Sequence, residues 1–498
     1  MSNVPQTNAE DDGRGPRVKS TTHAAIESRL QYLRTGTGPT SHTRAPIGGR
    51  DPWFNSLNQA AYEPGLGDAE PVLEAEAEEK PAANGPRAPE HRPRTSEELG
   101  IRSTIVEHLV LKALYLSGAL STRELAAQVR ISVNVADELV GRLRTDQLCQ
   151  VTGMSGNMLT VVLTEQGRKR ALELLSHNQY TGAAPVSLES YVTQVKKQSV
   201  RHFKVHRAAV ERAFSDLVID SRVLGQIGTG LNSGSSVFVH GPAGVGKTLI
   251  AETMSRVLAA DNVWVPYAVE VDGQMIAVFD PMIHKRVDGP ETENCDERWV
   301  RCERPCVLVG GELTIDMLDL QYNPTSKYYS GPVQMKANNG VLILDDFGRQ
   351  RVRPEELLNR WVVPLDRGID FLTMAGGRKI EVPFEMLVVF ATNMDPSDLV
   401  DAAFLRRMQT KIRVDAPTDD QFRRIFRAVA ARRGLDVDEE ALTGMIAVIR
   451  GLPQELRACQ PRDLVNQVCW SAQYEDRPPV LDRASLTSAV GAYFLTKS

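Results

Sequence analysis

The stretch that decides the fold of this chain is Gly241-Pro-Ala-Gly-Val-Gly-Lys247-Thr248. A short apolar run of strand character, residues 236–240, precedes it, and residues 249–258 follow with helical spacing and contain neither Gly nor Pro. Strand, glycine-rich loop and helix in this order form the context of a phosphate-binding loop. The stretch therefore predicts a binding site for a nucleoside triphosphate. Eight residues are assigned to it: Gly241, Pro242, Ala243, Gly244, Val245, Gly246, Lys247 and Thr248.

Each residue type in this loop has a chemical reason to be there. Glycines let successive backbone N–H groups converge on a polyphosphate without a Cβ in the way, and the helix that follows adds its positive N-terminal end. We expect Lys247 to reach the β and γ phosphates, and the Thr248 hydroxyl to ligate Mg²⁺.

Length and composition exclude several classes of protein. With 498 residues the chain is too long for one compact domain, and a net charge of −5 makes no overall case for nucleic acid or a membrane as partner. Six cysteines spread over such a length suit reduced thiols. No apolar stretch approaches the roughly 18 residues of a membrane span, and the N-terminus lacks a signal-peptide pattern. We expect a soluble, cytoplasmic protein.

Residues 1–98 have the composition of a disordered tail. Apolar residues are sparse and aperiodic, and residues 67–80 are acidic, so the segment cannot bury enough surface to offset chain entropy. Pro52-Trp53-Phe54 and Tyr62 could serve as a short docking motif, although isolated aromatic residues also occur in plain linkers.

Residues 99–178 show the pattern of a small helical domain with a hairpin. An apolar stripe over 105–116 predicts a first helix, Ser121-Thr-Arg-Glu124 forms a capping box for a second, and Ser132 can cap a third. Two β-rich stretches, 149–152 and 159–163, then predict a hairpin before a closing helix. This order resembles the winged-helix domains of bacterial transcription regulators.

The resemblance leaves the partner of this domain open. Nine Lys and Arg face seven Asp and Glu between residues 101 and 180, and the expected recognition helix carries Asp137 and Glu138 beside Asn134. Acidic side chains there repel phosphates, whereas Arg142, Arg144 and Arg168-Lys169-Arg170 suit phosphate contacts. Two alternatives remain open: DNA contact through 99–178, and docking of a protein or self-association. The weak charge balance favours the second. Residues 179–200 are expected to be a linker.

Two further strands end in polar residues that suit phosphate chemistry. Val341-Leu-Ile-Leu-Asp345-Asp346 predicts a buried strand followed by two carboxylates. Asp345 is expected to hold Mg²⁺, and Asp346 to orient or deprotonate the attacking water. A third strand, 386–391, leads to Asn393, whose amide could hold that water.

With these residues in place, the chain resembles an AAA+ ATPase over about 205–495. The loop matches Walker A, Asp345 and Asp346 match Walker B, and Asn393 matches sensor 1. Arg407, with Arg406 beside it, matches the arginine finger given to a neighbouring subunit, and Arg462 matches sensor 2. The family usually has Glu as the second Walker B acid, where this chain has Asp346. Slower hydrolysis or an altered trigger of hydrolysis is therefore one alternative.

The resemblance implies a fold class and an assembly. The fold class is α/β, a P-loop NTPase core with a parallel sheet at 201–416 and a helical lid at 417–498, preceded by the winged helix-turn-helix domain and the tail. The resemblance also implies ATP and Mg²⁺ as cofactors and self-association into a ring, with six subunits as the expected number.

Two features narrow the branch of this family. Residues 370–382 predict a hairpin before the sensor 1 strand, and 331–340 resemble the phrase before Walker B in MoxR-type and NtrC-type ATPases. Tyr328 or Tyr329 could grip a threaded substrate in a ring pore, or could simply pack within a surface loop. A second hairpin is expected over 267–279, around Asp272-Gly273.

A zinc site is disfavoured beyond this hairpin. His284, Cys295, Cys302 and Cys306 do not show the paired Cys-x2-Cys of structural zinc sites. Cys306 opens an apolar run and is expected to pack as a small hydrophobic residue.

Three functions fit this sequence. The first is a chaperone-like ATPase that remodels a protein client recruited by the tail and the winged helix. The second is a DNA-linked regulatory ATPase, and the third is a nucleotide-dependent scaffold with little hydrolysis.

Overall fold

The computed structural model describes residues 89, 92–156, 158–259, 261–287, 295–399 and 402–494. The segment 52–54 and Tyr62, considered above as a docking motif, lie outside the described residues, as does nearly all of the expected tail. Within the described part, no helix is both long and apolar enough to span a bilayer.

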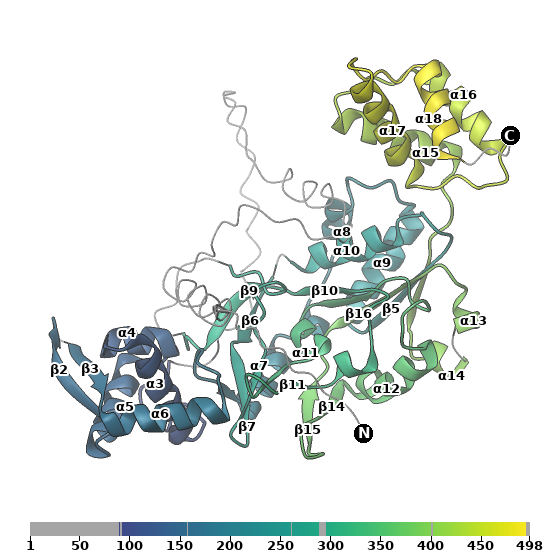
Figure 1. Ribbon diagram of the computed structural model, residues 1–498. Helices are drawn as coiled ribbons and strands as arrows, with labels where there is room; N and C mark the ends of the chain where they lie inside the picture. Colours follow the sequence, from purple (N-terminus) through teal and green to yellow (C-terminus); the bar gives the residue numbers. More distant parts are fainter. Residues whose placement is uncertain are drawn as a thin grey trace, which may run out of the picture. The chain divides into compact units, whose positions relative to one another are not determined.

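A five-stranded parallel sheet forms the centre of the region that contains the glycine-rich loop, which confirms the expected parallel sheet (Figure 1). Its strands, in spatial order, are β10 (Cys306–Val309), β13 (Val341–Leu344), β16 (Leu387–Thr392), β5 (Ser236–His240) and β17 (Thr410–Arg413). All four pairings are parallel, so the carboxyl ends of all five strands meet at one edge. The three strands that lead into the predicted site are neighbours in this order.

Alternation along the central strands gives the sheet two apolar faces. Val237 and Val239 of β5 point to one face, whereas Phe238 points to the other. The first face packs against α8 (Arg207–Ala213), α9 (Ser221–Ser233) and α10 (Lys247–Leu258). The second packs against α11 (Val333–Ala337) and α12 (Pro354–Arg367) (Figure 1). Strands buried on both faces explain the near-continuous apolar runs in the sequence.

A second five-stranded sheet and two two-stranded sheets, β14-β15 and β6-β9, lie beside this core. The expected hairpins over 267–279 and 370–382 are confirmed, as β7–β8 and β14–β15. The sheet has the order β11-β12-β8-β7-β4. The strands outside the central sheet are β4 (Val186–Ser187), β6 (Asn262–Pro266), β7 (Ala268–Val271), β8 (Gln274–Ala277), β9 (Trp299–Glu303), β11 (Gln321–Asn323), β12 (Tyr328–Ser330), β14 (Ile369–Thr373) and β15 (Lys379–Pro383).

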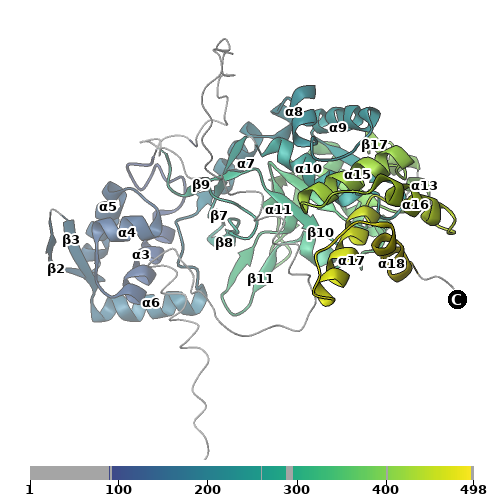
Figure 2. The same ribbon diagram turned by 90° about the horizontal axis from the view of Figure 1, so that it is seen from above.

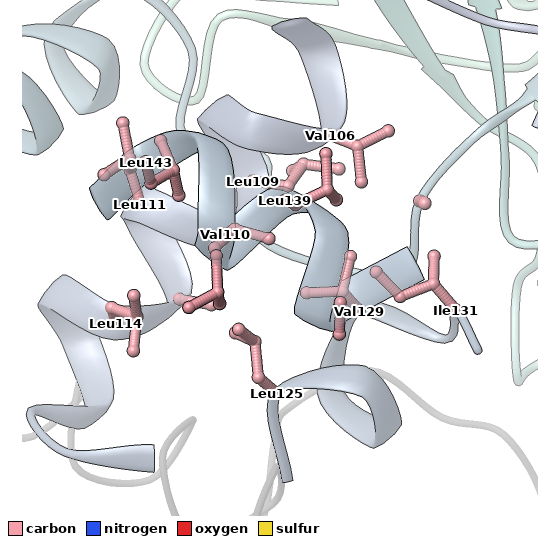
Figure 3. Packing of buried hydrophobic residues seen from close by; sticks show 14 of the residues in the cluster. Val106, Leu109, Val110, Leu111, Leu114, Leu125, Val129, Ile131, Leu139 and Leu143 are labelled. Atoms are coloured by element: carbon pink, nitrogen blue, oxygen red, sulfur yellow. The ribbon is translucent and has the colours of Figure 1, made fainter. Parts of the chain in front are cut away.

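The N-terminal described module has three helices, a three-stranded antiparallel sheet and a closing helix. The capping box of Ser121 and Glu124 and the Ser132 cap are both confirmed. Leu109, Leu125 and Leu139, from three different helices, point into one apolar core (Figure 3). The elements are α3 (Ser103–Ser117), β1 (Leu120–Ser121), α4 (Thr122–Val129), α5 (Val133–Thr145), β2 (Cys149–Ser155), β3 (Met158–Leu163) and α6 (Glu165–His177).

The C-terminal described residues form a group of helices, coloured yellow-green to yellow in Figure 2. This group has its own apolar core. The capping box of Thr418 and Gln421 is confirmed, and Pro461 lies in the first turn of its helix as expected. The four helices are α15 (Asp419–Arg432), α16 (Glu439–Arg450), α17 (Gln460–Tyr474) and α18 (Arg483–Tyr493).

Two segments differ from the sequence-based boundaries. Residues 179–200, expected to be a linker, contain β4, α7 (Leu188–Lys197) and a 3-10 turn, and Tyr191 and Val195 of α7 are buried. Residues 92–98, assigned to the tail, hydrogen-bond to the third helix, since Ser96 donates to the Glu138 carboxylate from both N and Oγ. Long-range partners order these polar segments, and a local sequence pattern does not reveal such partners.

Tyr328 and Tyr329 lie in β12, which pairs with β11, and both side chains pack against other parts of the chain. Tyr329 is buried, and its hydroxyl accepts a hydrogen bond from the Ala375 N–H at 2.8 Å. The Tyr328 ring meets the Tyr180 ring edge to face, with centroids 5.5 Å apart. These contacts favour the packing interpretation of Tyr328 and Tyr329 over substrate grip.

The remaining short helices are Val200–His202, Ile315–Leu318, α13 (Pro396–Leu399) and α14 (Ala402–Leu405).

Candidate nucleotide-binding site

The loop between β5 and α10 has a backbone that requires glycine. Gly241, Gly244 and Gly246 have φ values of 146°, 78° and 94°. A Cβ on Gly241 would lie 2.0 Å from the carbonyl oxygen of Val414, which is closer than any two such atoms can approach. Gly246 caps α10 with no side-chain acceptor, so the first N–H groups of that helix stay available to an anion.

Lys247 lies at the centre of the loop. Its Nζ donates to the carbonyl oxygens of Gly241 and Pro242, at 3.0 and 2.7 Å, and to Asn393 Oδ1 at 2.5 Å. Only 7% of the residue is exposed, and this burial lowers the pKa of the Lys247 ammonium, against the opposing charges of Asp346 and Asp345. An ammonium group already surrounded by oxygen acceptors is positioned to exchange them for phosphate oxygens.

The side-chain oxygens of Thr248 and Asp345 lie side by side. The Thr248 hydroxyl donates to the Asp345 carboxylate, at 2.9 Å from Oδ1 and 3.0 Å from Oδ2. A hydroxyl and a carboxylate side by side at the end of a phosphate-binding loop fit the hard oxygen coordination that Mg²⁺ prefers. The donor set therefore fits the metal that the sequence implies.

Asp346 and Asn393 complete the group. Asn393 Nδ2 donates to Asp346 Oδ1 at 3.2 Å, while its Oδ1 accepts from Lys247. Asp346 has a φ of 49°, a left-handed conformation that is uncommon outside glycine. The structure thus brings together five of the predicted residues, which follow the ends of three neighbouring strands: Lys247, Thr248, Asp345, Asp346 and Asn393.

The two predicted finger arginines lie elsewhere. The Ser236 hydroxyl donates to the carbonyl oxygen of Arg407 at 3.4 Å, which places Arg407 beside the first residue of β5. The loop follows the last residue of β5, roughly 13 Å further along at about 3.3 Å per residue. Arg407 Nε donates to both carboxylate oxygens of Asp366 at 2.9 and 3.0 Å, and Arg406 is exposed. Neither arginine belongs to the nucleotide loop of its own chain.

The start of α17 lies against the loop. The Cys459 N–H donates to the Gly244 carbonyl oxygen at 3.0 Å. Arg462, in the first turn of this helix, is exposed and donates from Nε to Asp463 Oδ1 at 3.0 Å. The structure therefore brings the segment before Arg462 to the loop, while the Arg462 guanidinium itself is engaged in an ion pair.

Sequence reasoning missed two residues that contribute to the site. Gln350 Nε2 donates to the Asp345 carbonyl oxygen at 2.8 Å, and its Oε1 accepts from the Gly348 N–H at 2.8 Å, which fixes the turn after the acidic pair. Glu252 lies on α10 one turn after Thr248, and burial raises the pKa of its carboxyl group, with Asp345 adding to that effect. The four-residue spacing from Thr248 is the one signal that could have identified Glu252.

The histidine considered with the cysteines is engaged on both sides. The Asp280 N–H donates to His284 Nδ1, and His284 Nε2 lies 2.9 Å from the carbonyl oxygen of Lys336. Burial lowers the pKa of His284. This ring stabilises a turn and has no nitrogen left for a metal.

Fold and site together define a phosphate-binding-loop α/β fold with a candidate nucleotide site at the carboxyl edge of its sheet. A family model described as a domain of unknown function (DUF8689) matches residues 418–492, which span α15–α18. No curated protein matches the chain.

Solved structures with partial similarity include three from bacteria. NtrX from Brucella abortus shows 14% identity over 58% of this chain, with a TM-score of 0.37, and the match spans 58% of the NtrX chain. The RuvB Holliday junction branch migration motor of Thermotoga maritima shows 15% identity, over 55% of this chain and 69% of its own, with a TM-score of 0.33. Domain III of the replication initiation protein DnaA from the same organism shows 11% identity, 57% and 98% coverage, and a TM-score of 0.34. With TM-scores this low, these likenesses carry no weight for the function of this chain.

Proposed function

We propose that this protein is an AAA+ ATPase that assembles into a ring and uses ATP hydrolysis to remodel a protein client. The observation that carries the proposal is the meeting of Lys247, Thr248 and Asp345 with Asp346 and Asn393 at one edge of the sheet. A purely structural role, such as an ion pair or a helix cap, does not need a glycine loop, a lysine, a threonine–carboxylate pair and an amide in one place. Binding and cleavage of a nucleoside triphosphate require all of them.

Each residue has a chemical task in this proposal. The loop N–H groups and Lys247 hold the phosphates and oppose the charge that develops on them. Thr248 and Asp345 would hold Mg²⁺, which would act as a Lewis acid on the phosphates when bound. Asp346 accepts a proton or a hydrogen bond from the attacking water, and Asn393, held between Lys247 and Asp346, orients that water.

The ring part of the proposal is supported by where Arg407 lies. Because Arg407 is beside the opposite end of β5 from the loop, it can act on a nucleotide only across a subunit boundary. An arginine supplied in this way accelerates phosphoryl transfer by roughly 10³ to 10⁵. We therefore expect an isolated subunit to bind ATP and to hydrolyse it slowly.

Mixing two inactive variants tests shared sites. Lys247→Ala disables the site of its own subunit, whereas Arg407→Ala disables the site of the neighbour. We expect each variant alone to hydrolyse ATP at a small fraction of the wild-type rate, and an equimolar mixture to recover activity. If neither substitution lowers turnover, or if mixing recovers nothing although both variants assemble, the shared-site proposal is wrong.

Asp366→Ala is the matched control for Arg407→Ala. It breaks the same surface ion pair and leaves the arginine in place, and such pairs contribute little to stability. Turnover close to wild type in Asp366→Ala would assign the loss in Arg407→Ala to the arginine itself.

The N-terminal module is proposed as a winged helix that docks a protein. The order of its helices and hairpin supports the winged-helix assignment, and Asp137 is exposed on α5, where it disfavours phosphate. DNA contact is the second candidate, favoured by exposed Arg144, Arg168 and Lys169. A gel shift of the full chain at several salt concentrations separates them, because DNA contact through these residues gives a steep salt slope that Arg168→Gln reduces.

The third candidate function is a nucleotide-dependent scaffold with little hydrolysis, and the residue that supports it is Asp346. Its carboxylate is one methylene shorter than the glutamate that the family carries. Comparing the steady-state ATP turnover of wild type and Asp346→Asn decides between the candidates, because the substitution would not lower the turnover of a scaffold.

A further inference from the structure

A short segment before α17 touches the phosphate-binding loop. Besides the Cys459 hydrogen bond to Gly244, two atoms of Arg457 are close. A Cβ placed on Gly244 would lie 3.2 Å from Arg457 Cδ and 3.4 Å from Arg457 Cβ. The stem of Arg457 therefore runs directly over the second glycine of the loop, and the guanidinium begins one bond beyond Cδ.

The backbone N–H of Arg457 has a hydrogen-bond partner, whereas its charged end has none among the described residues. The Arg457 N–H donates to Gln460 Oε1 at 2.9 Å, which anchors the residue at the start of α17. Within the described residues the Arg457 guanidinium has no hydrogen-bond or ion-pair partner. Arg462 differs, because its guanidinium pairs with Asp463, whose other oxygen accepts from the Tyr493 hydroxyl at 3.1 Å.

We propose that Arg457 is a nucleotide-binding residue that contacts the α and β phosphates of ADP and ATP alike. The argument rests on position: the glycine segment of such a loop cradles the α and β phosphates, whereas its lysine reaches the β and γ phosphates. Because the stem of the half-buried Arg457 crosses Gly244, its guanidinium can reach the shared phosphates before it reaches the γ phosphate. This inference rests on the proposed nucleotide site.

The experiment is nucleotide titration of the full chain by calorimetry, with ADP and with ATP in the presence of Mg²⁺. We expect Arg457→Gln to weaken the binding of both nucleotides by a similar factor, roughly 10- to 100-fold, because a charge-assisted hydrogen bond is lost. Arg457→Lys keeps the charge and loses the planar fork, so we expect a smaller loss. Arg462→Gln, as a γ-phosphate sensor, is expected to weaken ATP binding more than ADP binding.

Arg424→Gln is the matched control. Arg424 is an exposed arginine of α15 with no ion pair or side-chain hydrogen bond in the described part of the chain, so its loss removes one positive charge from the same group of helices. We expect its affinities to stay within twofold of wild type. Thermal unfolding without nucleotide shows whether each variant is folded.

Two results would overturn the proposal. One is a folded Arg457→Gln, or Arg457→Lys where the Gln variant does not fold, that binds both nucleotides as wild type does. The other is a loss confined to ATP. Failure of wild type to bind either nucleotide is a distinct result, and it would remove the proposed function along with the role of Arg457.

Discussion

Lys247 and Asn393 are joined by a hydrogen bond of 2.5 Å between Nζ and Oδ1. The two residues are far apart in sequence, yet each follows the end of one of two neighbouring strands. In the β5–β16 pairing, Thr392 lies opposite His240, so the residues after both strands leave the sheet together. The parallel register is therefore what gives the ammonium group an amide partner.

Removing this amide should separate binding from hydrolysis. In Asn393→Ala the loop and Lys247 remain, so we expect ATP affinity to change by only a few-fold. Hydrolysis should fall by roughly 100-fold, as when one preorganised polar group is removed from a transition state. Titration and steady-state turnover measure the two effects, and an equal loss in both would contradict the assignment of Asn393.

A methyl group on the first loop glycine should unfold the loop. Gly241→Ala forces a Cβ to within 2.0 Å of the Val414 carbonyl oxygen, at a φ of 146°. We expect a loss of about 2 kcal/mol or more in the free energy of unfolding, together with loss of nucleotide binding. The control is Gly225→Ala in α9, where a Cβ meets nothing within 4 Å and a helical alanine is favourable.

Arg298 should hold the N-terminal described module in place. Its guanidinium pairs with Asp296 at 2.7 Å and donates to the carbonyl oxygens of Leu99 and Pro185, and both charged groups are buried. Arg298→Leu leaves Asp296 buried and unpaired, which should lower the free energy of unfolding by about 3 to 5 kcal/mol. Urea unfolding measures this change. The double variant Asp296→Asn with Arg298→Leu should lose less free energy of unfolding than Arg298→Leu alone.

Lys112 should make stability rise with pH on the alkaline side. The residue is buried in α3 and donates from Nζ to the carbonyl oxygens of Asn178 and Tyr180, and burial lowers its pKa to about 8. The unfolded chain keeps this proton up to a pH of about 10.4. Between the two pKa values the unfolded state therefore binds more protons than the folded state, so the free energy of unfolding increases as pH rises.

Lys112→Met removes this dependence. We expect the stability of wild type relative to the variant to rise by about 2 kcal/mol between pH 7 and pH 9.5, in urea unfolding followed by circular dichroism. A constant difference at the two pH values would show that the ammonium group keeps its proton in the folded chain.

Local signals in the sequence were sufficient for most elements. The capping boxes at Ser121 and Thr418 depend on residues three apart, and the hairpin at Asp272-Gly273 depends on a two-residue turn. Helix α7 could not be found in this way, because its burial depends on distant residues, such as Asn338, which donates to the Tyr191 hydroxyl at 2.9 Å. The same holds for Tyr329, whose partner Ala375 belongs to another hairpin.

The sequence by itself determined the phosphate-binding loop, the acidic pair and the amide, because each is a residue type at a fixed distance from an apolar strand. Tertiary structure alone decided which of them meet. The order β13-β16-β5 brings Asp345, Asn393 and Lys247 to one edge, sends Arg407 to the opposite end of β5, and sets Arg457 over Gly244. Strand order and the contact between α17 and the loop arise from burial of apolar faces between segments far apart in the chain, and no local spacing encodes that burial.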